Sequence, residues 1–317
     1  MKHIKQVMIR NIEVIDAPRL LYFKRQSSLN MSYDLEGSLI NKNRSFPTLK
    51  YILKSLSPYS QNDHYLWSNK IIIDAVIRSV KIYNGFIWEI AELYSRNSSI
   101  SIAEKAIHQM CDLAASNGAF QVAIRLPAES PLYNSLVNLG FSMVQREITL
   151  QASCSCKTVV DISKVHTLGE LRREAPADLF SVYQMHVKTS PKKFNSIRIL
   201  NFNDWQKNTN NINNSSQKFV YEEKGSIEAS IEIATVEKNL LVKFDCSLID
   251  KPKIKELIAT ILTSGCGSHV RTLIPQHNQA IFEAFRESGF IVTQKYEVFY
   301  KKMKMPVTLK PKVVLSA

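Results

Sequence analysis

Residues 117–150 read NGAFQVAIRLPAESPLYNSLVNLGFSMVQREITL, and residues 266–299 read CGSHVRTLIPQHNQAIFEAFRESGFIVTQKYEVF. Each stretch has a glycine-containing turn, a strand-like run that ends in proline, a run with helical spacing, a Gly-Phe pair and a second strand-like run. Gly289 follows Gly140 by 149 residues, and Gly267 follows Gly118 by the same interval. A repeat of this kind indicates two copies of one folding unit.

The glycine of each Gly-Phe pair predicts where a helix ends. Gly140 and Gly289 follow apolar residues at helical spacing, and glycine adopts the left-handed conformation of a helix end at little cost. The helix before each glycine is expected to span about ten residues. Each copy therefore contains a strand–helix–strand unit.

The residues upstream of each unit follow one common order. An amphipathic helix is expected over residues 102–114 in the first copy and 254–262 in the second. Before these helices, alternating apolar residues predict strands at 65–67, 71–80 and 86–94, and at 219–222, 226–234 and 240–248. Residues 9–23 are expected to form a strand and then a helix capped near Asp16.

The chain length allows two domains. Its 317 residues suit two units of about 150 residues each. We expect an N-terminal domain over 1–152, a C-terminal domain over 160–305, and a tail or edge strand over 306–317. The Asn-rich stretch 208–216 is interpreted as a polar loop without a catalytic role.

Composition narrows the class of protein. Hydrophobic residues make up 45% of the chain and charged residues 22%, as in globular proteins. The five cysteines are scattered, and no run of residues is long and apolar enough to span a membrane, so a reduced, cytoplasmic protein is expected, without a membrane partner. His and Cys residues lack metal-ligand spacing, so no metal is expected. The net charge of +13 leaves a nucleic-acid partner open without indicating one, because it is divided between both halves.

This order of elements resembles the GNAT superfamily of acyl-CoA-dependent N-acyltransferases. The most specific carriers are the runs 131–141 and 278–290, which close on Gly-Phe, and the opening from Ile9-Arg10 to Asp16-Ala-Pro. The resemblance covers nearly the whole chain, once per half. It implies an α/β (α+β) fold of two tandem GNAT-like domains, each a mixed, mostly antiparallel sheet flanked by helices.

The resemblance also implies a cofactor, acetyl-CoA or another acyl-CoA. The family holds the cofactor's pyrophosphate on backbone amides of an Arg/Gln-x-x-Gly-x-Gly/Ala loop at a helix N-terminus. The matching segment in the first copy is Arg96, Asn97, Ser98, Ser99, Ile100 and Ser101, with serine at both small positions. A capping box formed by Ser101 and Glu104 would explain the same helix start without a ligand.

In the second copy the matching junction is unfavourable to a pyrophosphate. Asp250 stands where the helix should begin, and Pro252 removes an amide donor. Lys251, Lys253 and Lys255 could attract an anion, but a solvated helix face explains them as well. The cofactor is therefore expected in the first copy alone.

Acyl transfer to an amine requires a base and often an acid. The resemblance implies a glutamate on the strand before the loop, and Glu89 and Glu92 are the candidates. Their odd spacing is expected to place them on opposite faces of the strand. The family's tyrosine position holds Leu136 in the first copy and Phe285 in the second, and neither side chain has a proton to donate.

Three functions remain open from the sequence. The first is an acyl-CoA-dependent N-acyltransferase that acetylates or acylates a small-molecule or peptide amine, with the cofactor in the first copy and Glu89 or Glu92 as base. The second is a non-catalytic tandem GNAT-fold binding or scaffold protein. The third is tRNA-dependent aminoacyl transfer, as in the peptidoglycan-bridge ligases of similar arrangement.

Overall fold

A computed structural model describes residues 8–26, 30–40, 46–48, 64–69, 72–82, 85–153, 170–190, 201–207, 216–236, 239–247, 250–264 and 269–303. The first half contains β1 (Met8–Asn11), α1 (Ala17–Gln26), α2 (Leu35–Ile40), β2 (His64–Asn69), β3 (Ile72–Ile82), β4 (Ile87–Ser95), α4 (Ile100–Ser116), β5 (Gln121–Pro127), α5 (Tyr133–Asn138) and β6 (Ser142–Ser153). A 3-10 turn over Val14–Asp16 precedes α1.

The second half repeats this order. It contains β7 (Glu170–Arg173), α6 (Leu179–Thr189), α8 (Phe202–Lys207), β8 (Gln217–Glu223), β9 (Ser226–Val236), β10 (Asn239–Cys246), α9 (Lys251–Ser264), β11 (His269–Pro275), α10 (Gln279–Glu287) and β12 (Ile291–Lys302). A 3-10 turn over Pro176–Asp178 precedes α6, as its counterpart precedes α1. The predicted tandem repeat is therefore present in the structure.

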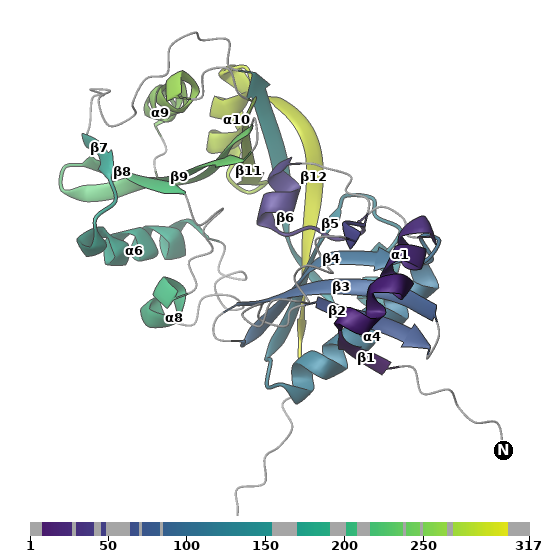
Figure 1. The fold of residues 1–317 in the computed structure, drawn as a ribbon. Helices are drawn as coiled ribbons and strands as arrows, with labels where there is room; N and C mark the ends of the chain where they lie inside the picture. The colour runs from purple at the N-terminus through teal and green to yellow at the C-terminus, as the bar shows by residue number, and fades with distance from the viewer. Residues whose placement is uncertain are drawn as a thin grey trace, which may run out of the picture.

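The twelve strands of the described residues form one sheet, in the order β1-β2-β3-β4-β5-β12-β6-β11-β10-β9-β8-β7. Only the β4–β5 and β10–β11 pairs are parallel among these neighbours, so the sheet is mixed and mostly antiparallel, as expected. The two halves exchange their last strands. Strand β12 lies between β5 and β6, and β6 lies between β12 and β11 (Figure 1).

The exchange links the two hydrophobic cores. Phe299 of β12 is buried in the first-half core with residues of α4, and Ile148 and Leu150 of β6 are buried in the second-half core with residues of α9. Leu39 of α2 adds a further contact, because it packs against Ala234 and Leu241 of the second half. Each core is therefore completed by the other half.

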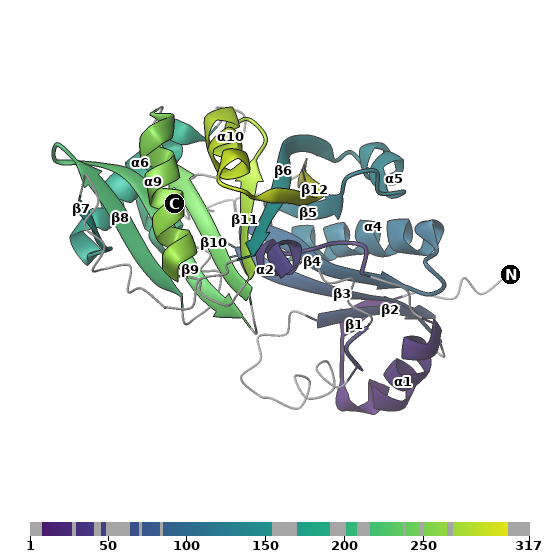
Figure 2. The ribbon, with the colours of Figure 1, turned by 90° about the horizontal axis from the view of Figure 1, so that it is seen from above.

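Helices cover both faces of the sheet. In the first half α4 and α1 lie on opposite faces (Figure 2), and in the second half α9 and α6 do the same (Figure 1). None of the helices in the described ranges combines the length and the apolar character that crossing a membrane requires. The layers match the helix-flanked sheet expected from the sequence.

Some local predictions are wrong. The helix before Gly140 has six residues, Tyr133–Asn138, because residues up to Leu132 belong to the preceding turn; its counterpart has nine. Asp16 lies where α1 begins, but its carboxylate accepts from the Glu13 amide and from Arg10 and Arg19 rather than capping α1.

Several predictions fall outside the described residues. These are the tail over 306–317, most of the boundary between 152 and 160, and residues 208–215 of the Asn-rich loop. The domain boundaries therefore stay a prediction.

Candidate functional site

A bulge in β4 shapes the cleft of the first half. The register between β3 and β4 shifts between the pairs Arg78–Glu92 and Ser79–Ile90, so β4 has one extra residue, Ala91. Strand β4 pairs with β5 only over Ile87–Ile90. Beyond Ile90 the two parallel strands separate, and their facing backbone groups need other partners.

The bulge corrects the prediction that Glu89 and Glu92 lie on opposite faces. Trp88, Ile90 and Leu93 all enter the core beneath α4, although strict alternation would send Leu93 to the other side. The extra residue shifts the alternation of faces by one position from Glu92 onward. Glu89 and Glu92 therefore both face away from α4. The structure therefore brings the two candidate carboxylates to one face.

The gap between β4 and β5 is filled by the chain itself. The Met31 amide donates to the Leu93 carbonyl at 2.8 Å, and the Leu93 amide donates to Asn30 Oδ1 at 2.9 Å. On the other side of the gap the Tyr33 amide donates to the Arg125 carbonyl at 3.1 Å. Ser32, between these contacts, is 0% exposed. We call residues 30–33 the bridging segment, because they join β4 to β5 where the strands separate.

Glu89 is held by a buried guanidinium. Arg125 of β5 lies 3.2 Å from Glu89 through Nη1 and 2.7 Å from Glu147 of β6 through Nε. The same Nη1 donates to the Tyr33 carbonyl at 3.3 Å. Arg125 therefore ties the candidate base both to the exchanged region of the sheet and to the bridging segment.

Glu92 is held by a second guanidinium. Arg78 Nε donates to Glu92 at 2.8 Å, and Arg78 also pairs with Asp34, directly after the bridging segment. The Tyr94 hydroxyl donates to the other Glu92 oxygen at 3.2 Å. Both oxygens of this buried carboxylate are thus engaged.

Most backbone amides of the predicted pyrophosphate loop donate hydrogen bonds to carbonyl groups of the protein itself. Asn97 and Ser98 both adopt left-handed backbone conformations, with φ of 53° and 54°. The amides of Arg96, Asn97 and Ser99 donate to the carbonyls of Asp74, Gln26 and Arg96. The Arg96 guanidinium pairs with Asp74 at 2.7 Å.

The start of α4 differs from the predicted capping box. Ser99, not Ser101, is the N-cap, and its hydroxyl accepts from the Ile102 amide. Glu104 instead accepts from the Ser135 hydroxyl. Among the described residues, only the Ile100 and Ser101 amides of this segment lack an acceptor, so two donors at the helix N-terminus remain for an anion.

The second half has a different junction. The register between β9 and β10 is continuous, so β10 has no bulge. Helix α9 begins directly after Asp250, as predicted, and its three lysines pair with glutamates: Lys251 with Glu283 and Glu287, Lys253 with Glu223, and Lys255 with Glu287. These ammonium groups are already neutralised. Residues 248 and 249 lie outside the described residues.

The positions matched to the family's tyrosine are apolar core. Leu136 and Phe285 are both fully buried, and Phe285 packs edge-on against Phe244 and Phe290. Across the described ranges, no group of three or more His, Cys, Asp or Glu side chains could hold a metal ion.

The sequence reasoning missed the partners of the candidate carboxylates. Asn30, Asp34, Arg78 and Arg125 come from separate elements, and no local motif identifies them. A second repeated signal was present in the sequence. Arg10 and Asp16, and Arg172 and Asp178, are spaced six residues apart in each half and form matching ion pairs.

The fold was compared with known proteins. A GCN5-related N-acetyltransferase from Sphaerobacter thermophilus is similar over 93% of this chain and 95% of its own, with a TM-score of 0.54 and 10% identity. A tandem GNAT protein from the clavulanic acid biosynthesis pathway is similar over 94% of this chain and 98% of its own, with a TM-score of 0.54 and 8% identity. This chain has the tandem GNAT fold.

A third structural neighbour was solved with a ligand. The N-myristoyltransferase of Saccharomyces cerevisiae, with bound myristoyl-CoA, is similar over 96% of this chain and 81% of its own, with a TM-score of 0.50 and 12% identity. No protein-family model and no curated protein matches the sequence. The structural neighbours of this chain thus include acyltransferases, and the likeness shows the fold.

Proposed function

We propose that this tandem GNAT protein is a binding protein that does not transfer acyl groups. The observation that carries the proposal is the bridging segment, residues 30–33. Its hydrogen bonds to Leu93 and Arg125 use the backbone groups that the separated strands would otherwise offer to a ligand. A cofactor in this gap would have to displace a buried part of the chain.

Displacement has a cost. Four hydrogen bonds join the bridging segment to Leu93 and Arg125. At about 1 kcal/mol each, opening the gap costs on the order of 3–4 kcal/mol. That cost lowers the apparent affinity for any ligand of the open gap by a factor of roughly 100 or more.

The chemistry of the site supports the same proposal. A general base must reach the amine, and the buried Glu92 carboxylate is directed at Arg78 and Tyr94. Glu89 faces Arg125. At the tyrosine positions, Leu136 and Phe285 have no proton for a departing thiolate.

Isothermal titration with acetyl-CoA tests the proposal. We expect no heat of binding up to about 1 mM cofactor, where an authentic GNAT acetyltransferase titrated in the same buffer gives a clear isotherm. Saturable binding of acetyl-CoA to this protein below that concentration would contradict the proposal.

The second candidate is transfer of an acetyl or acyl group from acyl-CoA to a small-molecule or peptide amine, with the cofactor in the first half. Three features favour it: the bulge in β4, the separation of β4 from β5 and the two amides at the start of α4. It requires the bridging segment to move. Thiol release that depends on an amine and is abolished by both Glu89→Gln and Glu92→Gln would establish this candidate.

A nucleic-acid partner and a cytoplasmic location stay proposals from composition. The net charge of +13 is the support for an RNA partner, which tRNA-dependent aminoacyl transfer would require. Filter binding to tRNA at low and high salt tests this point, and retention that does not fall with salt would remove it.

A further inference from the structure

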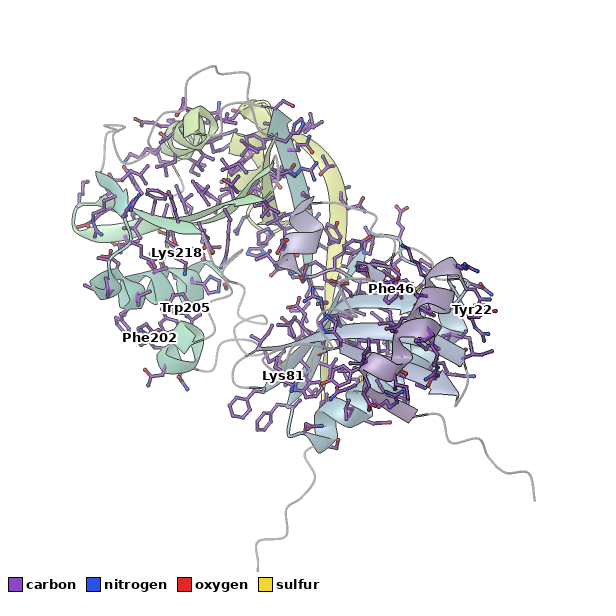
Figure 3. The ribbon with its side chains drawn as sticks, in the orientation of Figure 1. Tyr22, Phe46, Lys81, Phe202, Trp205 and Lys218 are labelled. Carbon is purple, nitrogen blue, oxygen red and sulfur yellow. The ribbon has the colours of Figure 1, made fainter. Side chains whose placement is uncertain are left out.

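A polar cavity lies between the sheet of the second half and the helices α6 and α8. Its volume is about 30 Å³. The side chains around it come from α6, α8, β8, β9 and β10 and from the residue that follows β7, and they include Glu174, His186, Trp205, Lys218, Glu232, Lys243 and Asp245. Figure 3 shows Trp205 of α8 and Lys218 of β8 on this side of the sheet. The cavity is separate from the β4–β5 gap of the first half.

Charges of opposite sign alternate across the strands beneath the cavity. Glu232 of β9 stands opposite Lys218 of β8 and Lys243 of β10 in the strand register. Asp245 lies two residues after Lys243, on the same face. A sheet face beneath a helix is normally apolar, but here Glu232 is buried and the side chains of Lys243 and Asp245 are only partly exposed, at 35% and 26%. Such a set needs a reason to be retained.

The Asp245 carboxylate approaches its charged neighbours without closing a hydrogen bond, whereas Glu232 accepts one from the Ser216 hydroxyl at 2.6 Å. Asp245 Oδ2 lies 3.8 Å from His186 Nδ1 and 4.0 Å from Lys243 Nζ. Charge-assisted hydrogen bonds are about 2.7–2.9 Å long, as in the 2.9 Å contact of Arg172 Nη2 with Asp178. Within the described ranges, the Asp245 carboxylate has no contact of hydrogen-bond length. The gap leaves room for a group that would complete it.

The size of the space limits that group. A cavity of about 30 Å³ holds a water molecule or an ammonium group and little more. It adjoins a wider depression of about 440 Å³ lined by Arg173, Ser216 and Gln217, and the two share Glu174 and Lys218. Burial raises the pKa of Glu174, against the opposing effect of Lys218, so this carboxyl group is desolvated at the junction of the two spaces. The inner space carries three carboxylates against two lysines, and the outer rim carries two cations against one carboxylate.

We propose that this site binds a small zwitterion of the amino-acid type. The ligand's ammonium group lies in the inner cavity between Glu232 and Asp245, beside the Trp205 ring, and its carboxylate lies at the mouth with Lys218 and Arg173. The inference rests on the proposed function, since it names the ligand class of a protein that binds without acyl transfer.

Titration calorimetry with three matched probes tests the site in the full-length protein. The probes are L-alanine, ethylamine, which lacks the carboxylate, and propionate, which lacks the ammonium group. We expect L-alanine to bind at least about tenfold more tightly than either analogue, because it alone satisfies both sets of charges. Equal binding of ethylamine and L-alanine, or no L-alanine binding up to about 10 mM, would overturn the proposal.

Two variants and two controls locate the binding. Asp245→Asn and Lys218→Gln are each expected to weaken L-alanine binding about tenfold or more. The matched changes Asp112→Asn and Lys24→Gln, at exposed positions of α4 and α1, are expected to leave it unchanged. L-alanine binding that survives both site variants would overturn the assignment. Circular dichroism checks that each variant is folded.

The acetyl-CoA titration separates this inference from the proposed function. L-alanine binding with no acetyl-CoA binding supports both. Acetyl-CoA binding would overturn the proposed function. It would also remove the inference that the zwitterion is the ligand of a protein without transfer activity. If neither ligand binds, the zwitterion site is overturned and the proposed function is not.

Discussion

Arg125 is the residue on which the buried network of the first half depends. Its side chain is 5% exposed and faces Glu89, Glu147 and the Tyr33 carbonyl. Arg125→Met should lower the free energy of unfolding by about 3–5 kcal/mol, because two buried carboxylates lose their partner. Urea denaturation at neutral pH measures it.

Arg146 provides the matched control for that change. It lies on β6, pairs with Glu297 and is 54% exposed. Arg146→Met should lower the free energy of unfolding by less than Arg125→Met does, because the Arg146 guanidinium is half exposed and pairs with one carboxylate, Glu297, rather than two. Equal effects of the two substitutions would show that Arg125 does not hold a buried network.

The contribution of Asp178 to the stability of the protein depends on pH. Hydrogen bonds from Arg172 hold the pKa of this carboxyl group below its ordinary value, helped by the Ala175 amide and opposed by burial. Stability from a carboxylate with a lowered pKa is present above the unfolded pKa, near about 3.9, and is lost as pH falls through the folded pKa. Asp178→Asn should therefore cost about 1–3 kcal/mol at pH 7 and progressively less below about pH 4.

Denaturation curves between pH 2 and pH 7 measure the Asp178 effect. Asp112→Asn is the control, since its side chain is 62% exposed and should matter little at any pH. A cost of Asp178→Asn that stays constant down to pH 2 would contradict the ion-pair explanation.

The sequence predicted where the candidate site residues lie in the fold, but not which groups they contact. The segment 96–101 lies at the start of a helix, as predicted, and Glu89 and Glu92 lie on the strand before it. The face of Glu92 could not be predicted, because a bulge of one residue reverses the alternation and leaves no mark in a strand of ordinary composition. The guanidinium partners come from distant parts of the chain, beyond the reach of local patterns.

Two glycines end the helices α5 and α10. Gly140 and Gly289 have φ of 84° and 89°, which confirms the left-handed ends inferred from the repeat. Gly140→Ala and Gly289→Ala should each lower the free energy of unfolding by about 1 kcal/mol. Thermal denaturation of both variants measures the cost.

Asparagine at the same positions is the control. Gly289→Asn should cost less than Gly289→Ala, because asparagine tolerates the left-handed region better than alanine. The space around Gly289 is open, with no atom within 4 Å of an added Cβ. Steric contact of the new Cβ therefore does not contribute to the difference in stability between the two variants. Equal costs for alanine and asparagine would count against a conformational origin.

Elements were predicted best where periodicity is strong and ends are marked. The strands of β3, β4, β9 and β10 and the helix α4 follow clear apolar patterns, and the structure confirms them. The short helix α5 was predicted too long, since Pro131 and Leu132 continue the helical spacing in a turn that precedes the helix. Spacing alone does not distinguish a turn from the first turn of a helix.

At the scale of the whole molecule, the exchange of β6 and β12 makes the two halves interdependent. Each of these strands completes the sheet and core of the other half. The sequence repeat predicted two copies but not the exchange, because both pairings satisfy the same strand pattern.

Cleavage of the connecting segment tests the exchange. A protease site placed within residues 154–169 should leave the two fragments associated after cutting, since the β6–β12 pairing and both cores hold them together. Size-exclusion chromatography without denaturant should show one species of unchanged volume. Separation into two folded fragments would contradict the exchanged arrangement.

The bridging segment closes the gap between β4 and β5 in the first half. Hydrogen–deuterium exchange of the full-length protein tests it most directly, because amides bonded within the sheet exchange slowly and those of a surface loop exchange quickly. We expect a peptide containing Met31 and Tyr33 to exchange as slowly as one from β4, with no change when acetyl-CoA is added. Rapid exchange of that peptide, or protection that appears only with acetyl-CoA, would show that the gap between β4 and β5 is open in the free protein.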